Sequence, residues 1–376
     1  MNRHVTRGQF LAASAVGLGA VLAGCGSSGG ASSTASSAAK SAAKSGGTQL
    51  TKGGTLNVWT WPGYWAPKNL SAYKAATGTT VNVASYQSDD QMYAKLKTAA
   101  GADFDIAIPD LGWIPVFSQS GLVQKIDHDR VPFKYIEKSV LGRPEDPNNE
   151  YSVPKDYAAT GVVYDPTAVG GKINTWHDFL DALSRPGVSG KAEMPSQASE
   201  ALGVGLWAMG KNWNTATQSD LTAAYNMLKP LVTHLKSFDD FDVAGVTNGS
   251  VVMAAMTNAN ARLAMLKNKK LAWVIPQPQS ELILDSYVIT HSAPDADQAY
   301  SFIDFMLQPK QQITDTVYLG YPLVLPGIES MVPKNMPLKE VVFVSPADLE
   351  RLEPLNVRED VQGFAEDLYT KLQAAA

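Results

Sequence analysis

The sequence predicts an α/β fold with two lobes, each built around its own hydrophobic core. Short apolar segments alternate along the chain with segments in which apolar residues recur every three or four positions. The first pattern is typical of strands and the second of amphipathic helices, and their alternation favours a parallel sheet with helices on both faces. About 320 of the 376 residues follow a distinct N-terminal stretch, which is enough chain for two cores.

The first part of this body alternates between strand and helix. Ser88 is a candidate N-cap, because a serine side chain can accept a hydrogen bond from a free amide of the first helical turn. Gly78 is a candidate helix end. The predicted elements are a strand at Thr55–Trp61, a helix at Asn69–Ala76, a strand at Thr80–Tyr86, a helix from Ser88 to Ala100, a strand at Phe104–Pro109 and a short helix from Trp113.

The second part repeats the pattern with clear apolar stripes, which are interpreted as core faces rather than cofactor sites. Thr175 is a candidate N-cap, and Pro230 ends or kinks the helix before it. The predicted strands are Ala159–Asp165, Lys191–Pro195, Val251–Met256, Leu271–Ile275 and Asp285–Thr290, the last after a polar loop. The predicted helices are Trp176–Leu183, Glu200–Met209, Leu221–Leu228, Ala299–Met306 and Val361–Leu372.

The N-terminus has the features of an export signal. Arg3 and Arg7 precede an uncharged apolar run of 13 residues, Phe10 to Leu22, which is too short to span a bilayer as a helix. Cys25 directly follows a small-residue cleavage site that resembles a bacterial lipobox. The sequence therefore predicts a signal peptide at residues 1–24 and lipid attachment at Cys25. Export by the general or the twin-arginine route stays open.

Residues 25–54 are predicted to be a flexible tether, because they consist almost entirely of Gly, Ser, Ala and Thr. The protein would then be extracytoplasmic and held at the membrane by its lipid. Cys25 is the single cysteine, so no intramolecular disulfide can form. Removal of residues 1–24 deletes two Arg and no acid, which takes the formal charge from −5 to −7. This acidic body argues against nucleic acid as a partner.

Aromatic and acidic side chains stand at the ends of several predicted strands. In open α/β sheets ligands bind outside the carboxyl ends of strands, and a cleft between two lobes is a natural site. Carboxylates and the faces of aromatic rings bind protonated amines well. The sequence therefore predicts a site for a small cationic solute. The candidates are Trp61, Tyr64, Asp110, Glu200 and Asp285.

Structural interpretations compete with this one. Asp110 could be a helix N-cap, and Glu200 could be a first-turn acid favoured by the helix dipole. Trp61 could belong to a lobe core, as Trp59 and Trp65 are expected to do. An aspartate such as Asp285 in an apolar strand would be costly to bury without a partner, which favours a binding role.

Patterns of catalytic residues are missing from the sequence. The five histidines, at positions 4, 128, 177, 234 and 291, lack metal-ligand spacing. The chain contains no G-x-S-x-G elbow, no Walker A motif and no G-x-G-x-x-G after a strand. We therefore expect a binding protein rather than an enzyme, with no metal or cofactor.

The body resembles the periplasmic spermidine/putrescine-binding proteins of ABC importers. The resemblance covers roughly residues 56–372 and consists of short motifs in the order that the family has them. These are Trp61-Pro62-Gly63-Tyr64, Met92-Tyr93-Ala94-Lys95-Leu96-Lys97-Thr98, Gln124-Lys125-Ile126-Asp127, Asp146-Pro147-Asn148-Asn149, Tyr151-Ser152-Val153-Pro154, Thr175-Trp176, Leu284-Asp285-Ser286 and Gly320-Tyr321-Pro322.

This resemblance implies a type II periplasmic binding fold, in which two α/β lobes joined by crossing strands close on a solute. It places one lobe at residues 55–157 plus 284–322 and the other at residues 158–283 plus 323–376. It also implies an ABC permease and its ATPase subunits as partners, and a monomeric protein. The residues that it assigns to the ligand site are Trp61, Tyr64, Glu200, Asp285 and Tyr321, with Asp110 and Trp113 in the adjoining pocket loop.

Several positions depart from the family pattern. Ile283 and Thr257 stand where aromatic residues are expected, and Gln197 stands where an acid is expected. Lys155 lies near the expected hinge, where it either faces the cleft or is a solvated surface residue. A polyamine is the leading ligand. The alternatives are another amine-bearing solute, such as γ-aminobutyrate or an opine, and a role as an envelope interaction lipoprotein without transport.

Overall fold

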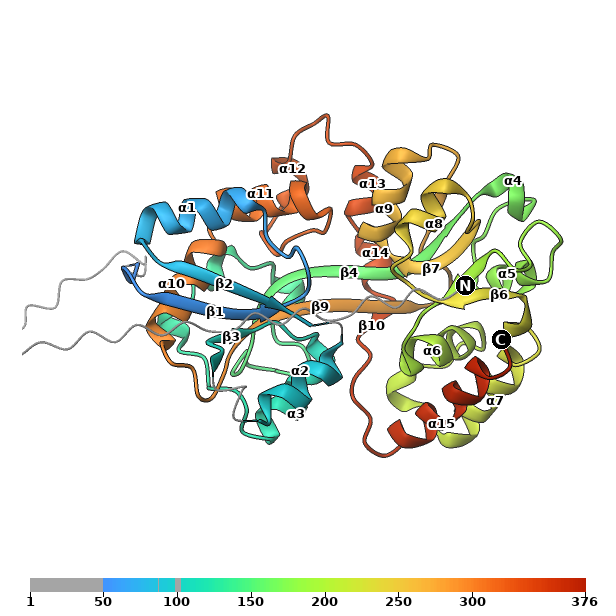
Figure 1. The fold of residues 1–376 in the computed structure, drawn as a ribbon, viewed down its shortest axis with the longest axis horizontal. Coiled ribbons are helices and arrows are strands. Elements are labelled where there is room, and N and C mark those ends of the chain that lie inside the picture. The colour runs from blue at the N-terminus through green and yellow to red at the C-terminus, as the bar shows by residue number, and fades with distance from the viewer. Residues whose placement is uncertain (1–49, 87, 99–102) are drawn as a thin grey trace, which may run out of the picture. The chain divides into compact units, whose positions relative to one another are not determined.

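The computed structural model describes residues 50–86, 88–98 and 103–376, where the chain forms a mixed β-sheet flanked by helices (Figure 1). The predicted signal peptide, Cys25 and nearly all of the predicted tether lie outside these residues. None of the helices in this part of the chain combines the length and the apolar character that a membrane crossing requires. The strands are β1 (Thr55–Thr60), β2 (Thr80–Ser85), β3 (Ile106–Ala107), β4 (Val153–Tyr164), β5 (Ala192–Met194), β6 (Leu235–Phe238), β7 (Met253–Thr257), β8 (Ala272–Val274), β9 (Ser280–Ile289) and β10 (Leu352–Glu353).

The strands join in the order β2-β1-β3-β9-β4-β7-β5-β6, with β10 beside β9 and β8 beside β4. β1 is parallel to β2 and β3, and β5 is parallel to β6 and β7. β9 is antiparallel to both β3 and β4, and β4 is antiparallel to β7. The purely parallel sheet expected from the alternation is therefore wrong. β4 and β9 run side by side through the middle of Figure 1 and connect the two groups of helices.

Most helices form where the sequence predicts them. α5 matches its predicted limits, because Thr175 and Asp178 form a reciprocal capping box at its start. α2 begins after Ser88, whose side chain accepts a hydrogen bond from the amide of Gln91, but it ends at Leu96 rather than Ala100. The helices are α1 (Pro67–Thr77), α2 (Asp89–Leu96), α3 (Ile114–Gln119), α4 (Pro166–Val169), α5 (Trp176–Leu183), α6 (Ala198–Ala208), α7 (Gln218–Leu228), α8 (Val243–Asn248), α9 (Asn258–Lys267), α10 (Ala296–Met306), α11 (Pro309–Leu319), α12 (Ile328–Met331), α13 (Lys339–Val342), α14 (Pro346–Leu349) and α15 (Gln362–Gln373).

Two large clusters of buried apolar side chains give the fold two lobes. The first cluster takes its residues from positions 56–153 and again from 284–324, and it includes Trp59 and Trp65. The second takes its residues from positions 162–255 and 355–372 and includes Trp176. The expectation that Trp59 and Trp65 pack in a core is therefore confirmed. The residue limits of the two lobes stay a prediction.

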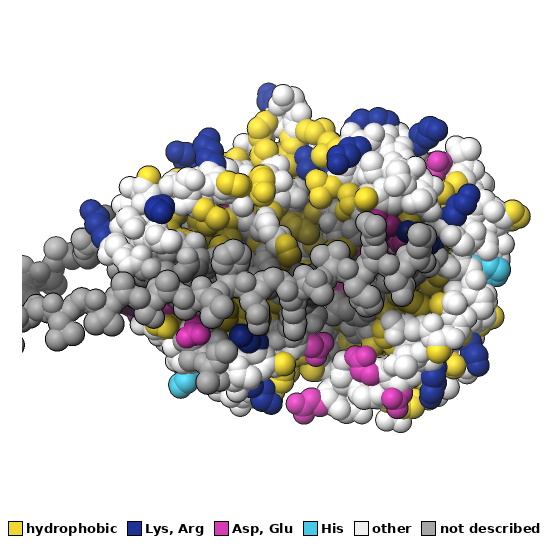
Figure 2. Space-filling view, in the orientation of Figure 1, with side chains coloured by type: hydrophobic (Ala, Val, Ile, Leu, Met, Phe, Trp, Pro, Cys, Tyr) yellow, Lys and Arg dark blue, Asp and Glu magenta, His cyan; other side chains and the backbone are white. Residues whose placement is uncertain are grey.

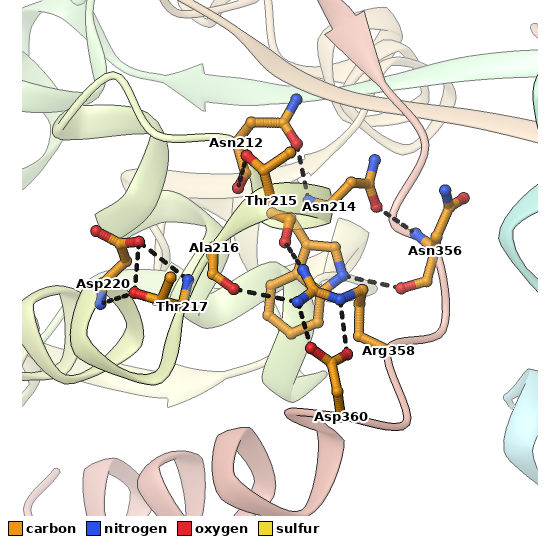
Figure 3. Close-up of polar contacts among 10 residues, drawn as sticks. Asn212, Asn214, Thr215, Ala216, Thr217, Asp220, Asn356, Arg358 and Asp360 are labelled. Atoms are coloured by element: carbon orange, nitrogen blue, oxygen red, sulfur yellow. Dashed lines mark hydrogen bonds and ion pairs between the residues drawn. The ribbon is translucent and has the colours of Figure 1, made fainter.

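A segment near the C-terminus, residues 354–360, ties parts of both lobes together. Arg358 donates hydrogen bonds to the carbonyl oxygens of Trp213 and Ala216, at 2.9 and 3.2 Å, and pairs with Asp360 (Figure 3). On the other side, the amide of Val357 donates to the carbonyl oxygen of Gly112 at 3.3 Å. We call residues 354–360 the C-terminal strap.

Candidate functional site

A cavity of about 600 Å³ lies between residues of the two lobes. All seven ligand-site residues predicted from the sequence line it: Trp61, Tyr64, Asp110, Trp113, Glu200, Asp285 and Tyr321. Four further carboxylates line it that the sequence did not single out, and these are Asp89, Asp156, Asp240 and Glu281. No Lys, Arg or His of the described part of the chain lines the cavity.

The crossing strands supply the cavity floor through their two-residue periodicity. Successive side chains of a strand point to opposite faces, so residues two apart share a face. On β9 the lining residues are Glu281, Ile283 and Asp285. The prediction that Asp285 begins its strand is therefore wrong, because β9 starts at Ser280. The sequence carries a signal for Glu281, which stands four residues before Asp285, but the polar residues of this segment predict a loop rather than a strand.

A bulge in β4 brings two acids opposite each other. Pro154 pairs with Ser286 but Asp156 pairs with Asp285, so Lys155 is an extra residue in the ladder. Like charges directly opposite each other destabilise a sheet. A β-bulge changes the direction in which the side chains of its strand point. The Tyr64 hydroxyl lies between the two acids, 2.7 Å from Oδ1 of Asp156 and in hydrogen-bond contact with Oδ2 of Asp285.

Lys155 is buried and does not lie on the solvated surface, so the surface interpretation is wrong. Its exposed fraction is 0%, and its Nζ forms an ion pair with Oδ2 of Asp156. The same Nζ lies 3.6 Å from the ring centroid of Tyr64 and 5.6 Å from that of Trp65. A buried charge requires such a partner, because the cost of removing it from water is otherwise several kcal/mol.

Asp110 forms the N-cap that the sequence allowed and also lines the cavity. Its Oδ1 accepts from the amide of Gly112 at 2.9 Å, as an N-cap does, and its Oδ2 accepts from the amide of Leu284 at 3.0 Å. It therefore fixes the loop before α3 against β9 while lining the cavity. Loss of water around the carboxyl raises the pKa of Asp110 to about 6, although these hydrogen bonds oppose the rise. Its own amide donates to Asp89 at 3.3 Å.

Three carboxylates from three segments form the other acidic part of the cavity. Glu281 accepts from the Thr160 hydroxyl at 2.5 Å, Glu200 from the side-chain amide of Gln197 at 2.8 Å, and Asp240 from the Ser196 hydroxyl at 2.6 Å. Burial raises the pKa of Glu281 to about 8. Burial, followed by the charges of Glu281 and Asp240, raises the pKa of Glu200 well above its usual range. The sequence analysis does not predict β6, the strand before Asp240, and therefore gives no reason to place Asp240 in the site.

Burial and neighbouring acids also act on the residues near the bulge. The pKa of Asp285 is raised well above its ordinary value, first by burial and then by the charges of Asp156 and Asp110. The Tyr64 hydroxyl carries a single proton and touches two carboxylates, so it can donate to only one of them at a time. A proton on Asp285 would satisfy the second contact.

Aromatic faces form the remaining walls. Trp61 packs against Tyr86 with ring centroids 4.5 Å apart, and Tyr64 lies edge-on to Tyr321 at 6.5 Å. Tyr318 of α11, half exposed, belongs to the cavity margin. Figure 2 shows hydrophobic side chains gathered over α11 and α12.

The three positions that depart from the family pattern also line the cavity: Gln197, Thr257 and Ile283. Chemically, the arrangement suits a cation, because a low-dielectric cavity lined with acids concentrates positive charge. Among residues 50–86, 88–98 and 103–376, no cluster of three or more His, Cys, Asp or Glu has an arrangement that could hold a metal ion.

Known proteins support the same fold and class. The spermidine/putrescine-binding periplasmic protein of Escherichia coli K12 is 27% identical over 325 residues, which cover 85% of this chain and 92% of that protein. The putrescine/agmatine-binding protein of Pseudomonas aeruginosa is 25% identical over 323 residues, with coverage of 80% and 86%. The crystal structure of the spermidine/putrescine ABC transporter substrate-binding protein PotD from Streptococcus pneumoniae superposes with a TM-score of 0.74 at 25% identity, covering 85% of this chain and 99% of that one. The expected periplasmic binding fold is thus confirmed. A family model matches residues 68–339, and the chain belongs to the bacterial extracellular solute-binding proteins.

Proposed function

We propose that the protein captures a polyamine such as putrescine or spermidine and delivers it to an ABC importer. One observation carries this proposal: seven carboxylates and several aromatic faces line one cavity, and no Lys, Arg or His among the described residues lines it. Each ammonium group of a polyamine can form charge-assisted hydrogen bonds with the acids, and its methylene chain can lie against the rings. The names of the relatives agree with this ligand class.

The spacing of the acids supports a ligand with positive charge at both ends. Asp285 and Glu281 lie four residues apart on the same face of β9, which corresponds to roughly 13 Å along an extended strand. Asp156 stands opposite Asp285, and Glu200 neighbours Glu281 closely enough for their charges to interact. A linear polyamine can place one terminal ammonium in each acidic group.

The alternative ligands fit less well. γ-Aminobutyrate and opines carry a carboxylate, which needs a cation or several donors, and the described lining residues are acidic, aromatic, apolar or neutral. An envelope lipoprotein without a solute would not need a 600 Å³ acidic cavity, because burying unpaired acids costs stability.

We propose further that residues 1–24 direct export, that Cys25 carries the lipid and that residues 25–54 tether a monomeric receptor to the membrane. The partners would be the importer's permease and ATPase subunits, and no bond chemistry is required of the receptor. The lobes, at residues 55–157 plus 284–322 and residues 158–283 plus 323–376, would close on the solute.

The proposal is tested by thermal shift and calorimetry with the Cys25→Ser protein, which cannot take the lipid. The panel contains putrescine, spermidine, γ-aminobutyrate and an opine. A ligand at a hundred times its Kd stabilises the folded protein by about 2.7 kcal/mol, which shows as a rise in Tm. We expect a rise with the polyamines. No rise and no heat with any amine would refute the proposal.

A further inference from the structure

The oxygen atoms of the facing acids Asp156 and Asp285 are unequally used. Oδ1 of Asp156 accepts from the Tyr64 hydroxyl at 2.7 Å, and Oδ2 of Asp156 is paired with Lys155. Oδ2 of Asp285 is in contact with the same Tyr64 hydroxyl. Asp285 is only 4% exposed, and its Oδ1 is buried. This oxygen has no hydrogen-bond partner among the described residues. One acceptor atom is therefore left for a ligand.

Lys155 supplies Asp156 with a cation from the protein itself. Its ammonium is paired with a carboxylate and lies over the Tyr64 ring, which is how a protein holds an organic cation. Lys155 itself does not line the cavity, whereas Tyr64 and Asp156 do, so the side chain reaches the pair from behind the wall. The bulge in β4 makes this possible, because it inserts Lys155 opposite no residue of β9.

We propose that Lys155 is a built-in cation that makes this end of the cavity select a primary ammonium group and reject a guanidinium. The inference rests on the proposed function and specifies the head group that the site accepts. A guanidinium binds a carboxylate through two parallel N–H···O bonds in a planar fork and needs two free acceptor oxygens. An ammonium is a compact charge whose donors rotate, so Oδ1 of Asp285 is sufficient for it.

The test compares putrescine with 1,4-diguanidinobutane by calorimetry on the full Cys25→Ser chain. The two probes share a four-carbon spacer. The second carries a guanidinium at both ends, so either orientation in the cavity places a guanidinium beside Asp285. We expect the wild-type site to bind putrescine at least about tenfold more tightly than the diguanidine. A guanidinium N–H that is removed from water without finding an acceptor costs free energy of binding. Equal affinity for both probes would overturn the proposal.

A variant and its control assign the preference to Lys155. Lys155→Met frees Oδ2 of Asp156, and the ratio of affinities should move by about tenfold or more toward the diguanidine. Lys155→Met combined with Asp156→Asn removes both charges and adds no anionic acceptor, so its ratio should stay near the wild-type value. A folded Lys155→Met protein with the wild-type ratio would overturn the assignment.

Folding is checked by circular dichroism, because loss of Lys155 leaves a buried carboxylate unpaired. If Lys155→Met does not fold, Lys155→Ala replaces it, since the space it leaves can admit water to the carboxylate of Asp156 while no side-chain donor occupies Oδ2. An unchanged ratio in that variant also counts against the proposal. If the wild-type protein binds neither probe, nor spermidine, the proposed function itself fails. Binding of amines without head-group preference removes only the role of Lys155.

Discussion

Binding of a polyamine should tighten strongly between pH 6 and pH 8. Burial, followed by the negative charges of Asp110, Asp240 and Glu353, raises the pKa of Glu281 to about 8. The ammonium needs the ionised carboxylate, so protons compete with the ligand. With a pKa of about 8, Glu281 is ionised in roughly 1% of molecules at pH 6 and in roughly 50% at pH 8.

The apparent Kd varies inversely with the fraction of molecules that can bind, so Glu281 alone should make it about fiftyfold smaller at pH 8 than at pH 6. Asp285 and Glu200 also have raised pKa values and act in the same direction. Putrescine keeps both of its charges over this range, since alkylammonium groups titrate near pH 10. Calorimetry at pH 6, 7 and 8 measures the effect.

Protons should leave the protein when the ligand binds at pH 7, so the measured heat will depend on the ionisation enthalpy of the buffer. The matched control is Glu281→Gln, which keeps the size of the side chain and an acceptor for Thr160 but cannot titrate. Its affinity should be lower at pH 8 and its pH dependence clearly weaker. A wild-type Kd that stays within twofold between pH 6 and pH 8 would refute the reasoning.

Without ligand, the same raised pKa should affect folding stability in the opposite direction. The stabilising effect of a neutral, buried Glu281 is fully present below its ordinary pKa of 4.5 and is lost as the pH rises through about 8, so urea midpoints of the empty protein should fall from pH 5 to pH 8.5. Asp285→Asn removes a charge but little volume, so it should weaken putrescine binding roughly ten- to hundredfold in calorimetry, while an unchanged affinity would place Asp285 outside the ligand contacts. Gly112→Ala would bring a Cβ within 2.5 Å of the Leu355 carbonyl oxygen and should cost about 1–3 kcal/mol in urea unfolding. Gly363→Ala is its control, since nothing lies within 4 Å of that position in α15, and equal losses in the two variants would contradict the close contact with the strap.

Local signals made much of this fold predictable. α5 lies at its predicted position because its capping box depends on only four consecutive residues, Thr175 to Asp178. The aromatic and acidic residues at strand ends come together because the carboxyl ends of neighbouring strands meet at one edge of the sheet. Trp61 and Asp110 follow the parallel neighbours β1 and β3 and line one cavity for this reason.

Long-range pairing set the limit of prediction. The sequence predicts that β9 starts at Asp285, because Ser280 and Glu281 are polar. The strand is nevertheless buried along nearly all of its length, and its acidic side chains Glu281 and Asp285 line the cavity. The bulge at Lys155 depends on the register between β4 and β9, which are more than a hundred residues apart. No local pattern reveals that register, so the ion pair of Lys155 with Asp156 could not be anticipated.

The position of β9 also determines when the first lobe can fold during synthesis. That lobe's core combines residues 56–153 with residues 284–324, and β3 has β9 as its neighbour in the sheet. A chain that leaves the ribosome N-terminus first therefore keeps the apolar faces of β1 and β3 uncovered until β9 and α10 emerge. Such distant pairings slow folding and prolong the exposure of apolar surface. A polypeptide that completes its first lobe only near the end of translation stays unfolded for most of its synthesis. In that state it can still pass through a secretion channel.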